Sequence, residues 1–438
     1  MRRVKCVPVF LFLLLISIHE LYAQAIIKGL VKDAGTGERL IGAHVYDTET
    51  YLGTITNEKG EFEFQIPEGQ HQLIITFIGY KSEKRSFFAE VKRMIKMDDI
   101  LLKPVIYQLK DLVVTEYKNP EKLIRLARKH YRRVGVDLHF EVDQFYRWIT
   151  SHDSIPVHWS EAVYTLNENK NDNWWKLREG RMASNENAPQ LPRVFYIDLI
   201  DMLRNFNVFE KLLEVPAPLS ESWNTFYDFK IIRRSYLDSL EVYQIGITPK
   251  YGEMNLFRGS VYIETRNFNI VAADIYIAKF RNPDVVQYDR SVIHKGRFEF
   301  ENTSLWYHFR AAPISVNKEE NQKYWLPISS DAILLTDLDA RLQFNKKQRI
   351  EQNLNKSKYH ITSRLITQCH STSFRYRFKH FRIHKKEATK NSNFISELRK
   401  KVYHPDYWSN MYRFGVGKLD EKTVKYFKID GKVKFSTK

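Results

Sequence analysis

Short runs of alternating apolar and polar residues recur along most of this chain of 438 residues, and they restrict its fold more than any other feature. The clearest run is FRGSVYIETRNFNIVAADIYIAKF, at positions 257–280. Successive side chains of a β-strand point to opposite faces, so the alternation predicts an antiparallel hairpin. The residues expected to share its apolar face are Phe257, Gly259, Val261 and Ile263 on the first strand and Val271, Ala273, Ile275 and Ile277 on the second.

Several other segments show the same alternation. FEVDQFYRWITS and SEAVYTLNE, between residues 140 and 168, are expected to pair, and another hairpin is expected around residues 237–239. Aromatic residues make up 14% of the chain, and aromatic side chains suit strands better than helical bundles. The sequence therefore predicts a mostly β protein with a minor α+β character. Residues 136–340 are expected to form a large curved antiparallel sheet with one apolar face.

Residues 26–104 have shorter strands. AIIKGLVKD, AHVY, EFEFQI and HQLIITF are separated by turn sequences such as TNEKG. Short alternating strands with turn signals at close spacing predict a small β-sandwich. Two of its glycines, Gly37 and Gly42, are expected where the backbone turns or approaches a neighbour closely.

The same segments carry the motifs GLVKD, TGERLIGAHV, GTITNEKGEFEF and LIITFIGY, and together they resemble the carboxypeptidase regulatory-like domain. One departure is Leu30, which precedes Val31 where the family keeps a single polar residue. The resemblance implies a prealbumin-like β-sandwich without catalytic residues. It also implies an exported protein of Bacteroidetes type, since this domain occurs there at the N-terminus of many exported proteins, including TonB-dependent outer-membrane receptors. Roughly 320 residues follow, too few for the receptor barrel, so a TonB-dependent transporter is not expected.

Residues 105–135 are expected to form a linker and then a helix. Pro120 suits the first position of a helix, because its missing N–H would have no partner there. The apolar residues that recur at helical spacing are Leu123, Ile124, Leu126, Ala127 and Tyr131.

Two downstream segments, GSVYIETRNFNIVAADIYI and KYWLPISSDAILL, resemble the middle region of exported bacterial proteins. Those proteins join this N-terminal domain to a sheet reminiscent of periplasmic lipoprotein carriers. The segment VYHPDYWSNMYRFGVGKLDEKTVKYFK, residues 402–428, is similar to the closing segment of the same proteins. These families are mostly of unknown function, so the resemblance implies an architecture and a location rather than a chemistry.

The N-terminal residues are typical of an export signal. Three basic residues precede an apolar run of 12 residues at positions 7–18, and small residues follow at Ala23 and Ala25. A transmembrane helix takes about 20 apolar residues, so this run is short for a span. We expect a signal peptide at residues 1–23, with an uncleaved anchor as the alternative. The expected location is the periplasm or the periplasmic side of the outer membrane.

Positive charge is concentrated in the last quarter of the chain. The formal net charge is +17, and residues 345–401 hold 16 Lys and Arg against three Glu. Within this basic C-terminal region, residues 341–438, a patch would attract anionic lipid, glycolipid or polysaccharide of the envelope. Nucleic acid is not expected, because an exported protein rarely meets it. A solvated face without a ligand is the alternative.

The most suggestive part of this region is TSFRYRFKHFRIHKK, residues 372–386. As a strand it would present two unlike faces, an aromatic one formed by Phe374, Tyr376 and Phe378 and a cationic one formed by Arg375, Arg377 and Lys379. The alternation slips at His380 and Phe381, where a bulge is expected. The candidate ligand-binding residues are Arg375, Arg377, Lys379 and Arg382. The alternative is a strand whose aromatic side is buried and whose basic side faces water.

Catalytic motifs are weak. His158 and Glu161 form an H-x-x-E, the spacing with which carboxypeptidases bind zinc, and His294 would be the third ligand. The surrounding residues alternate like strands, which does not suit that site. Cys369 has His360 and His370 nearby in the sequence, but a single cysteine in a strand is more often a small apolar residue. The chain has no G-x-S-x-G and no P-loop, and no cofactor is expected.

Three functions follow from these features. The first is a non-catalytic binding or scaffolding protein of the cell envelope, with an outer-membrane protein as one kind of partner. The second is a periplasmic carrier that holds a lipid or lipid-linked ligand against the apolar face of the sheet. The third is a zinc carboxypeptidase that uses His158 and Glu161. A carrier needs apolar sheet residues without an opposing layer, whereas in a scaffold the expected helix or the C-terminal segment covers that face.

Overall fold

The computed structural model describes most of the chain outside the N-terminal segment and several connections. The described residues are 24–40, 43–47, 53–56, 59–77, 80–90, 93–104, 119–137, 140–168, 174–188, 195–197, 216–237, 240–279, 286–288, 295–315, 323–351, 354–378, 398, 403–408, 421–429, 432–433 and 435. The expected signal peptide, His294, Lys379, His380, Phe381 and Arg382 lie outside these residues.

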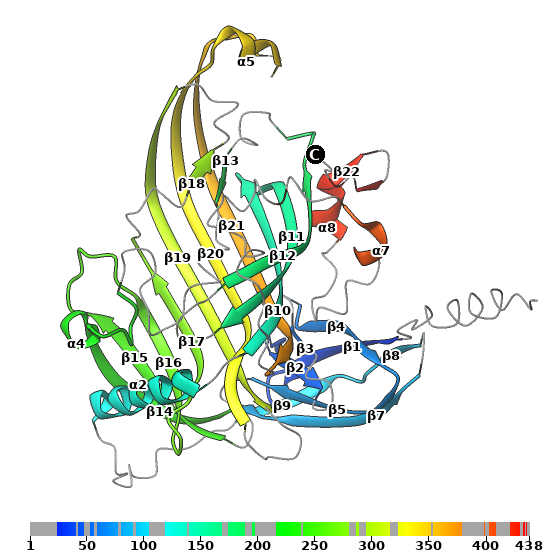
Figure 1. The fold of residues 1–438 in the computed structure, drawn as a ribbon, viewed down its shortest axis with the longest axis vertical. Helices are drawn as coiled ribbons and strands as arrows, with labels where there is room; N and C mark the ends of the chain where they lie inside the picture. The colour runs from blue at the N-terminus through cyan, green and yellow to red at the C-terminus, as the bar shows by residue number, and fades with distance from the viewer. Residues whose placement is uncertain are drawn as a thin grey trace, which may run out of the picture.

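Two small sheets form the N-terminal domain (Figure 1). The strands are β1 (Gln24–Asp33), β2 (His44–Asp47), β3 (Gly53–Ile55), β4 (Glu61–Pro67), β5 (Gly69–Thr76), β6 (Tyr80–Lys81), β7 (Glu83–Ala89), β8 (Met94–Lys96) and β9 (Ile100–Pro104). One sheet has the order β4-β1-β9-β6 with β8 beside β1, and the other has the order β3-β2-β5-β7. Their inward residues, among them Ile27, Val45, Phe64 and Leu73, are fully buried in one apolar cluster. The predicted β-sandwich is therefore confirmed.

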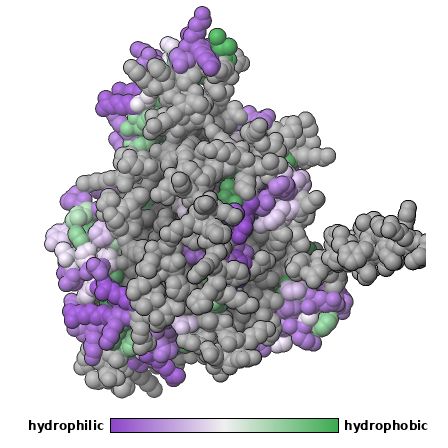
Figure 2. All heavy atoms as spheres, viewed as in Figure 1, coloured by the Kyte–Doolittle hydropathy of each residue, from purple (hydrophilic) through white to green (hydrophobic). Residues whose placement is uncertain are grey.

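The helix α2 (Pro120–Asp137) begins at the predicted proline. Asn119 caps it, because its Oδ1 accepts hydrogen bonds from the backbone N–H groups of Glu121 at 2.8 Å and Lys122 at 3.3 Å. Leu123, Ile124 and Ala127 are fully buried against the large sheet. Figure 2 shows hydrophilic side chains gathered over the end of the molecule that carries α2. The helix is therefore amphipathic, with its apolar stripe used inside the molecule.

Ten antiparallel strands form one large, strongly curved sheet (Figure 1). In spatial order they are β12 (Trp174–Ser184), β11 (Ile155–Glu168), β10 (Phe140–His152), β21 (Lys358–Arg377), β20 (Lys323–Gln343), β19 (Lys295–Ser315), β17 (Ile270–Ile277), β16 (Arg258–Glu264), β15 (Leu240–Pro249) and β14 (Tyr227–Leu237). The predicted pairing of β10 with β11 and the hairpins β14–β15 and β16–β17 are confirmed. The domains touch where β6 contacts β14.

The sheet extends beyond the boundary predicted at residue 340. Strand β21 lies between β10 and β20, so residues up to Arg377 belong to the sheet rather than to a separate basic region. Sequence reading missed this because the short helix α5 (Lys346–Glu351) and the local basic composition interrupt the alternation. One of the two strands that pair with β21, namely β10, is also far away in the sequence, and no local pattern reveals such a pairing.

One residue of the predicted hairpin faces the other way. Ile263 pairs with Ile270 and Tyr262 pairs with Ala272, so Val271 is the extra residue of a bulge. Val271 then packs with Val242, Tyr262 and Ala272 on the opposite face of the sheet. Its expected place beside Ala273 and Ile275 was wrong, because a bulge reverses the alternation.

Several short elements complete the described chain. They are β13 (Phe195–Ile197), α4 (Trp223–Phe226), β18 (Val286–Tyr288), α7 (Pro405–Trp408), α8 (Glu421–Val424), η5 (Lys425–Phe427), β22 (Lys428–Ile429) and β23 (Lys432–Val433). Trp408 packs with Phe145 and Val163, and Phe427 packs with Trp159 and Ala183. The C-terminal elements therefore cover the β10–β12 end of the sheet. Among the described helices, none has the length and apolarity that a membrane span requires.

Candidate functional site

The two faces of the large sheet differ in chemistry. The core face carries the main apolar cluster, which includes Tyr146, Tyr164 and Leu334 and which α2 covers. The opposite face carries a row of polar residues, one from each of eight neighbouring strands, directly opposite one another in register. From β12 to β16 this polar ladder consists of Arg181, Glu161, Arg147, His370, Asp331, His308, Asp274 and Ser260. Side chains in such positions lie within contact distance of each other.

One end of the polar ladder is buried. Glu161 is fully buried, and its two carboxylate oxygens accept hydrogen bonds at 2.6 Å from Nε of Arg147 and Nε of Arg181. The Arg181 guanidinium also lies 4.5 Å from the ring centre of Trp408 and 4.4 Å from that of Phe435. Burial by itself raises the pKa of Glu161, but the two arginines outweigh it and hold that pKa below the ordinary value. This end is a buried, ion-paired anchor for the C-terminal elements.

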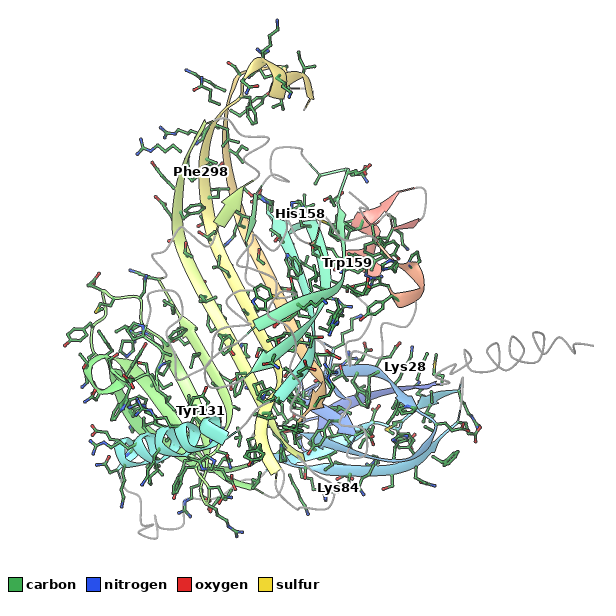
Figure 3. The ribbon with its side chains drawn as sticks, viewed as in Figure 1. Lys28, Lys84, Tyr131, His158, Trp159 and Phe298 are labelled. Carbon is green, nitrogen blue, oxygen red and sulfur yellow. The ribbon has the colours of Figure 1, made fainter. Side chains whose placement is uncertain are left out.

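The geometry around Glu161 bears directly on the zinc hypothesis. His158 and Glu161 are three residues apart on β11, so they point to opposite faces of the sheet. His158 Nδ1 lies 3.3 Å from Ser184 Oγ, while both oxygens of Glu161 are held by arginines. Figure 3 shows His158 and Trp159 as neighbours on β11. Among the described residues, no three His, Cys, Asp or Glu side chains form a group able to hold a metal ion.

The other end of the polar ladder is partly open. His308 Nδ1 lies 2.9 Å from Asp274 Oδ1, and Arg310 Nη1 lies 2.7 Å from the same oxygen. His370 Nδ1 lies 2.6 Å from Asp331 Oδ1. Burial raises the pKa of Asp274, but His308 and Arg310 outweigh it and lower that pKa to about 2. The pKa of Asp331 is lowered too, since His370, with smaller contributions from His308 and Arg310, outweighs burial. Both carboxylates are therefore ionised at neutral pH.

Asp331, His370 and Thr372 stand in the order of a catalytic triad. His370 Nε2 lies 2.7 Å from Thr372 Oγ1, while Nδ1 faces Asp331. Two observations argue against acyl transfer. Thr372 is 93% buried, since only 7% of its surface is exposed, and β21 has a strand on each side. The backbone N–H groups of β21 are thus engaged in the sheet and are not available as an oxyanion hole.

Only part of the predicted basic site lies among the residues that the structure describes. Arg377 donates hydrogen bonds to Glu141 at 3.1 Å and to both oxygens of Asp143 at 2.8 and 2.9 Å. Hydrogen bonding to Asp143 raises the pKa of Arg377 most, with a smaller contribution from Glu141. Arg375 lies opposite Asp143 in register, and its side chain is not described. Lys379 and Arg382 lie outside the described residues. The one described guanidinium of this set is therefore an internal ion-pair partner.

The aromatic side of the same strand packs inward. The rings of Tyr376 and Phe378 are stacked, with centroids 6.3 Å apart and an angle of 14° between their planes. The Phe140 ring lies 5.5 Å from that of Tyr376. A bulge lies within the described part of this strand, because Asp143 pairs with Arg375 while the next residue of β10 pairs with Ser373. The bulge expected at His380 falls outside the described residues.

Cys369 belongs to the core face. It is 2% exposed and lies in the main apolar cluster. His370 is the next residue of the strand and projects from the polar ladder, while His360 Nε2 lies 2.8 Å from Asp339. The burial of Cys369 in that cluster agrees with its interpretation as a small apolar residue.

Two family models match the chain. Residues 27–114 match the CarboxypepD_reg-like domain, and residues 140–311 match a family of unknown function, DUF5686. The TonB-dependent receptor SusC of Bacteroides thetaiotaomicron is 35% identical over 91 residues, which are 21% of this chain and 9% of the receptor. The chain therefore spans less than a tenth of that relative. These matches confirm an N-terminal carboxypeptidase regulatory-like domain followed by a region of a family without an assigned function.

Solved structures also resemble part of the chain. An outer-membrane lipoprotein-sorting protein domain from Vibrio parahaemolyticus is 11% identical, with coverage of 61% of this chain and 97% of that one and a TM-score of 0.29. A LolA superfamily protein from Nitrosomonas europaea is 9% identical, with coverage of 62% and 97% and a TM-score of 0.23.

Proposed function

We propose that this protein is a non-catalytic binding or scaffolding protein of the cell envelope. The observation that supports this most is how the core face of the large sheet is filled. Leu123, Ile124 and Ala127 of α2 are fully buried in the same cluster as the sheet residues. Burial of a leucine or isoleucine side chain contributes about 1.5–3 kcal/mol, so the helix is firmly seated.

Other parts of the chain fill the same face. Trp223 of α4 is 4% exposed and Leu398 is 3% exposed, and both belong to the main apolar cluster. Leu398 packs so tightly on Gly180 that a Cβ atom built there would lie 2.0 Å from Leu398 Cδ1. A lipid carrier needs apolar sheet residues that no other layer covers. The chain's own packing therefore favours a scaffold over a carrier.

The matches agree with this function at a coarse level. They comprise a regulatory-like domain and a family of unknown function, and no catalytic family is among them. The proposed location is the periplasm or the periplasmic side of the outer membrane. The proposed partners are an outer-membrane protein or an anionic lipid, glycolipid or polysaccharide of the envelope.

Native mass spectrometry of the protein purified from its own envelope fraction tests the proposal. We expect the bare polypeptide mass, together with a protein partner captured by crosslinking before lysis. A bound mass in the lipid range would overturn the scaffold in favour of the carrier. One zinc ion per chain that is lost in His158→Ala would overturn it in favour of a metallopeptidase.

A further inference from the structure

We propose that the open end of the polar ladder binds a neutral carbohydrate chain, with Trp306, Tyr276 and His308 as the principal contacts. This inference rests on the proposed binding function and names a ligand class for it. The surface lies on β17, β19 and β20, opposite the core face and away from the C-terminal elements that cover β10–β12.

An exposed aromatic pair is the first observation. Tyr276 of β17 and Trp306 of β19 are directly opposite in register, and their rings are stacked with centroids 4.5 Å apart and planes 18° apart. Trp306 is nevertheless 42% exposed. Tryptophan is on average a highly buried residue, and its ring has an apolar face and a polar N–H. A pre-stacked, accessible indole is suited to a ligand that offers a flat apolar surface.

A polar rim adjoins the aromatic pair. His308 follows Trp306 by two residues on β19, so both project from the same face about 7 Å apart. The His308 side chain is 42% exposed, and Asp274 and Asp331 flank it on the neighbouring strands with side chains 28% and 31% exposed. Imidazole and carboxylate groups exchange hydrogen bonds with hydroxyl groups. Apolar ring contact beside a row of hydroxyl partners is the chemistry of a sugar ring.

The charge of the surface selects among carbohydrates. The cationic and imidazole groups of this surface are already held by its own carboxylates: Arg310 lies 2.7 Å and His308 2.9 Å from Asp274 Oδ1. Phosphate, sulfate or uronate groups would have to compete with these carboxylates for the same partners. A neutral glycan does not need to displace them. The ligand therefore differs from the anionic one that the overall positive charge of the chain suggests.

A protein partner is the less favourable occupant. A protein interface removes water from its centre, and removal of water from ionised carboxylates costs several kcal/mol per ion. The centres of protein interfaces are depleted in charged residues for this reason. A glycan leaves the site wet, so Asp274 and Asp331 keep their water.

Affinity gel electrophoresis of the full chain tests the inference, with dextran, laminarin, yeast mannan and a neutral galactan as the immobilised probes. We expect retardation in at least one gel, and a loss of affinity of tenfold or more in Trp306→Ala. His308→Ala is expected to lose about fivefold. Tyr251→Ala is the matched control, because Tyr251 is 50% exposed at another site, and it is expected to migrate like the wild type.

Several results would overturn the inference. These are absence of retardation by all four neutral polysaccharides, equal retardation of Trp306→Ala and wild type, or retardation by alginate alone. A different outcome would point to a protein partner instead of a glycan. In that case a protein would crosslink to the wild type but not to Trp306→Ala, and none of the polysaccharide gels would retard the wild type. A bare mass in native mass spectrometry combined with no retardation would remove this inference and leave the proposed scaffold intact.

Discussion

The two ends of the polar ladder lie on one face of one sheet, yet they differ in what surrounds them. At the β12 end, Glu161 has two arginine partners, and one of them, Arg181, lies against the rings of Trp408 and Phe435. At the β17 end, Asp274 has similar partners but remains partly exposed to water. The same alternation of charge is therefore an anchor where the chain covers it and an accessible surface where the chain does not.

Removal of the buried carboxylate should have the largest effect. Glu161→Gln removes the buried carboxylate that Arg147 and Arg181 share, and loss of one partner of a buried ion pair costs about 3–5 kcal/mol. Urea denaturation should show this decrease in the free energy of unfolding. The matched variant at the open end, Asp331→Asn, should lose about 1 kcal/mol. Equal losses at both ends would contradict the distinction between anchor and open surface.

Removal of the Trp408 ring, which covers the buried end of the polar ladder, should have the second-largest effect on stability. Trp408 is 2% exposed and packs on Phe145, Val163 and the Arg181 guanidinium. Trp408→Ala deletes a buried ring and should lower the free energy of unfolding by about 3 kcal/mol. Trp306→Ala, at the open end, should lower it by less than about 1 kcal/mol. Thermal unfolding followed by circular dichroism measures both losses. A larger loss in Trp306→Ala than in Trp408→Ala would show that the exposed indole stabilises the fold.

The open end of the polar ladder should affect how the free energy of unfolding depends on pH under acidic conditions. The pKa of Asp274 is about 2 when folded, below its ordinary value of 3.8. A lowered pKa means that the contribution is complete above about pH 4 and is lost as the pH falls through 2. In Asp274→Asn, the free energy of unfolding should therefore change less between pH 4 and 2 than it does in the wild type. An equal change in the two proteins would mean that His308 and Arg310 do not hold the carboxylate ionised.

A small effect on stability is also expected at Arg377. Its ion pairs with Glu141 and Asp143 are 27% exposed on the arginine side, so Arg377→Gln should cost about 1 kcal/mol. Because these charges are already paired inside the protein, sedimentation with phosphatidylglycerol vesicles should not change. Arg364→Gln serves as the comparison, since that side chain is 56% exposed on the same strand. Loss of vesicle binding in Arg377→Gln alone would restore the predicted basic site.

Local patterns were enough for much of the fold. Pro120 and the apolar stripe that follows it predicted α2, and alternation predicted the hairpins and the sandwich. Val271 was misplaced because a bulge inserts one residue without any signal in the sequence. The domain boundary near residue 340 failed for a different reason, since β21 pairs with β10 across more than 200 residues of chain.

The polar ladder was not predictable in the same way. Each member is a polar residue at an ordinary place in an alternating strand, and no short motif links His308, Asp331 and His370. Only strand order and register bring them into one row. The H-x-x-E motif was readable, but Arg147 and Arg181 decide the state of its carboxylate, and both come from neighbouring strands.

The sequence by itself determined which segments are strands, which face of each is apolar, and the resemblance of the first domain to a known family. The period of two along a strand and the spacing of turn residues are local properties of the chain, so they can be read from it. Only the tertiary structure decided which carboxylates are buried, which arginines neutralise them and which aromatic ring stays exposed. Those properties depend on pairing and covering by distant segments such as β21 and α7, and on water that the covering removes.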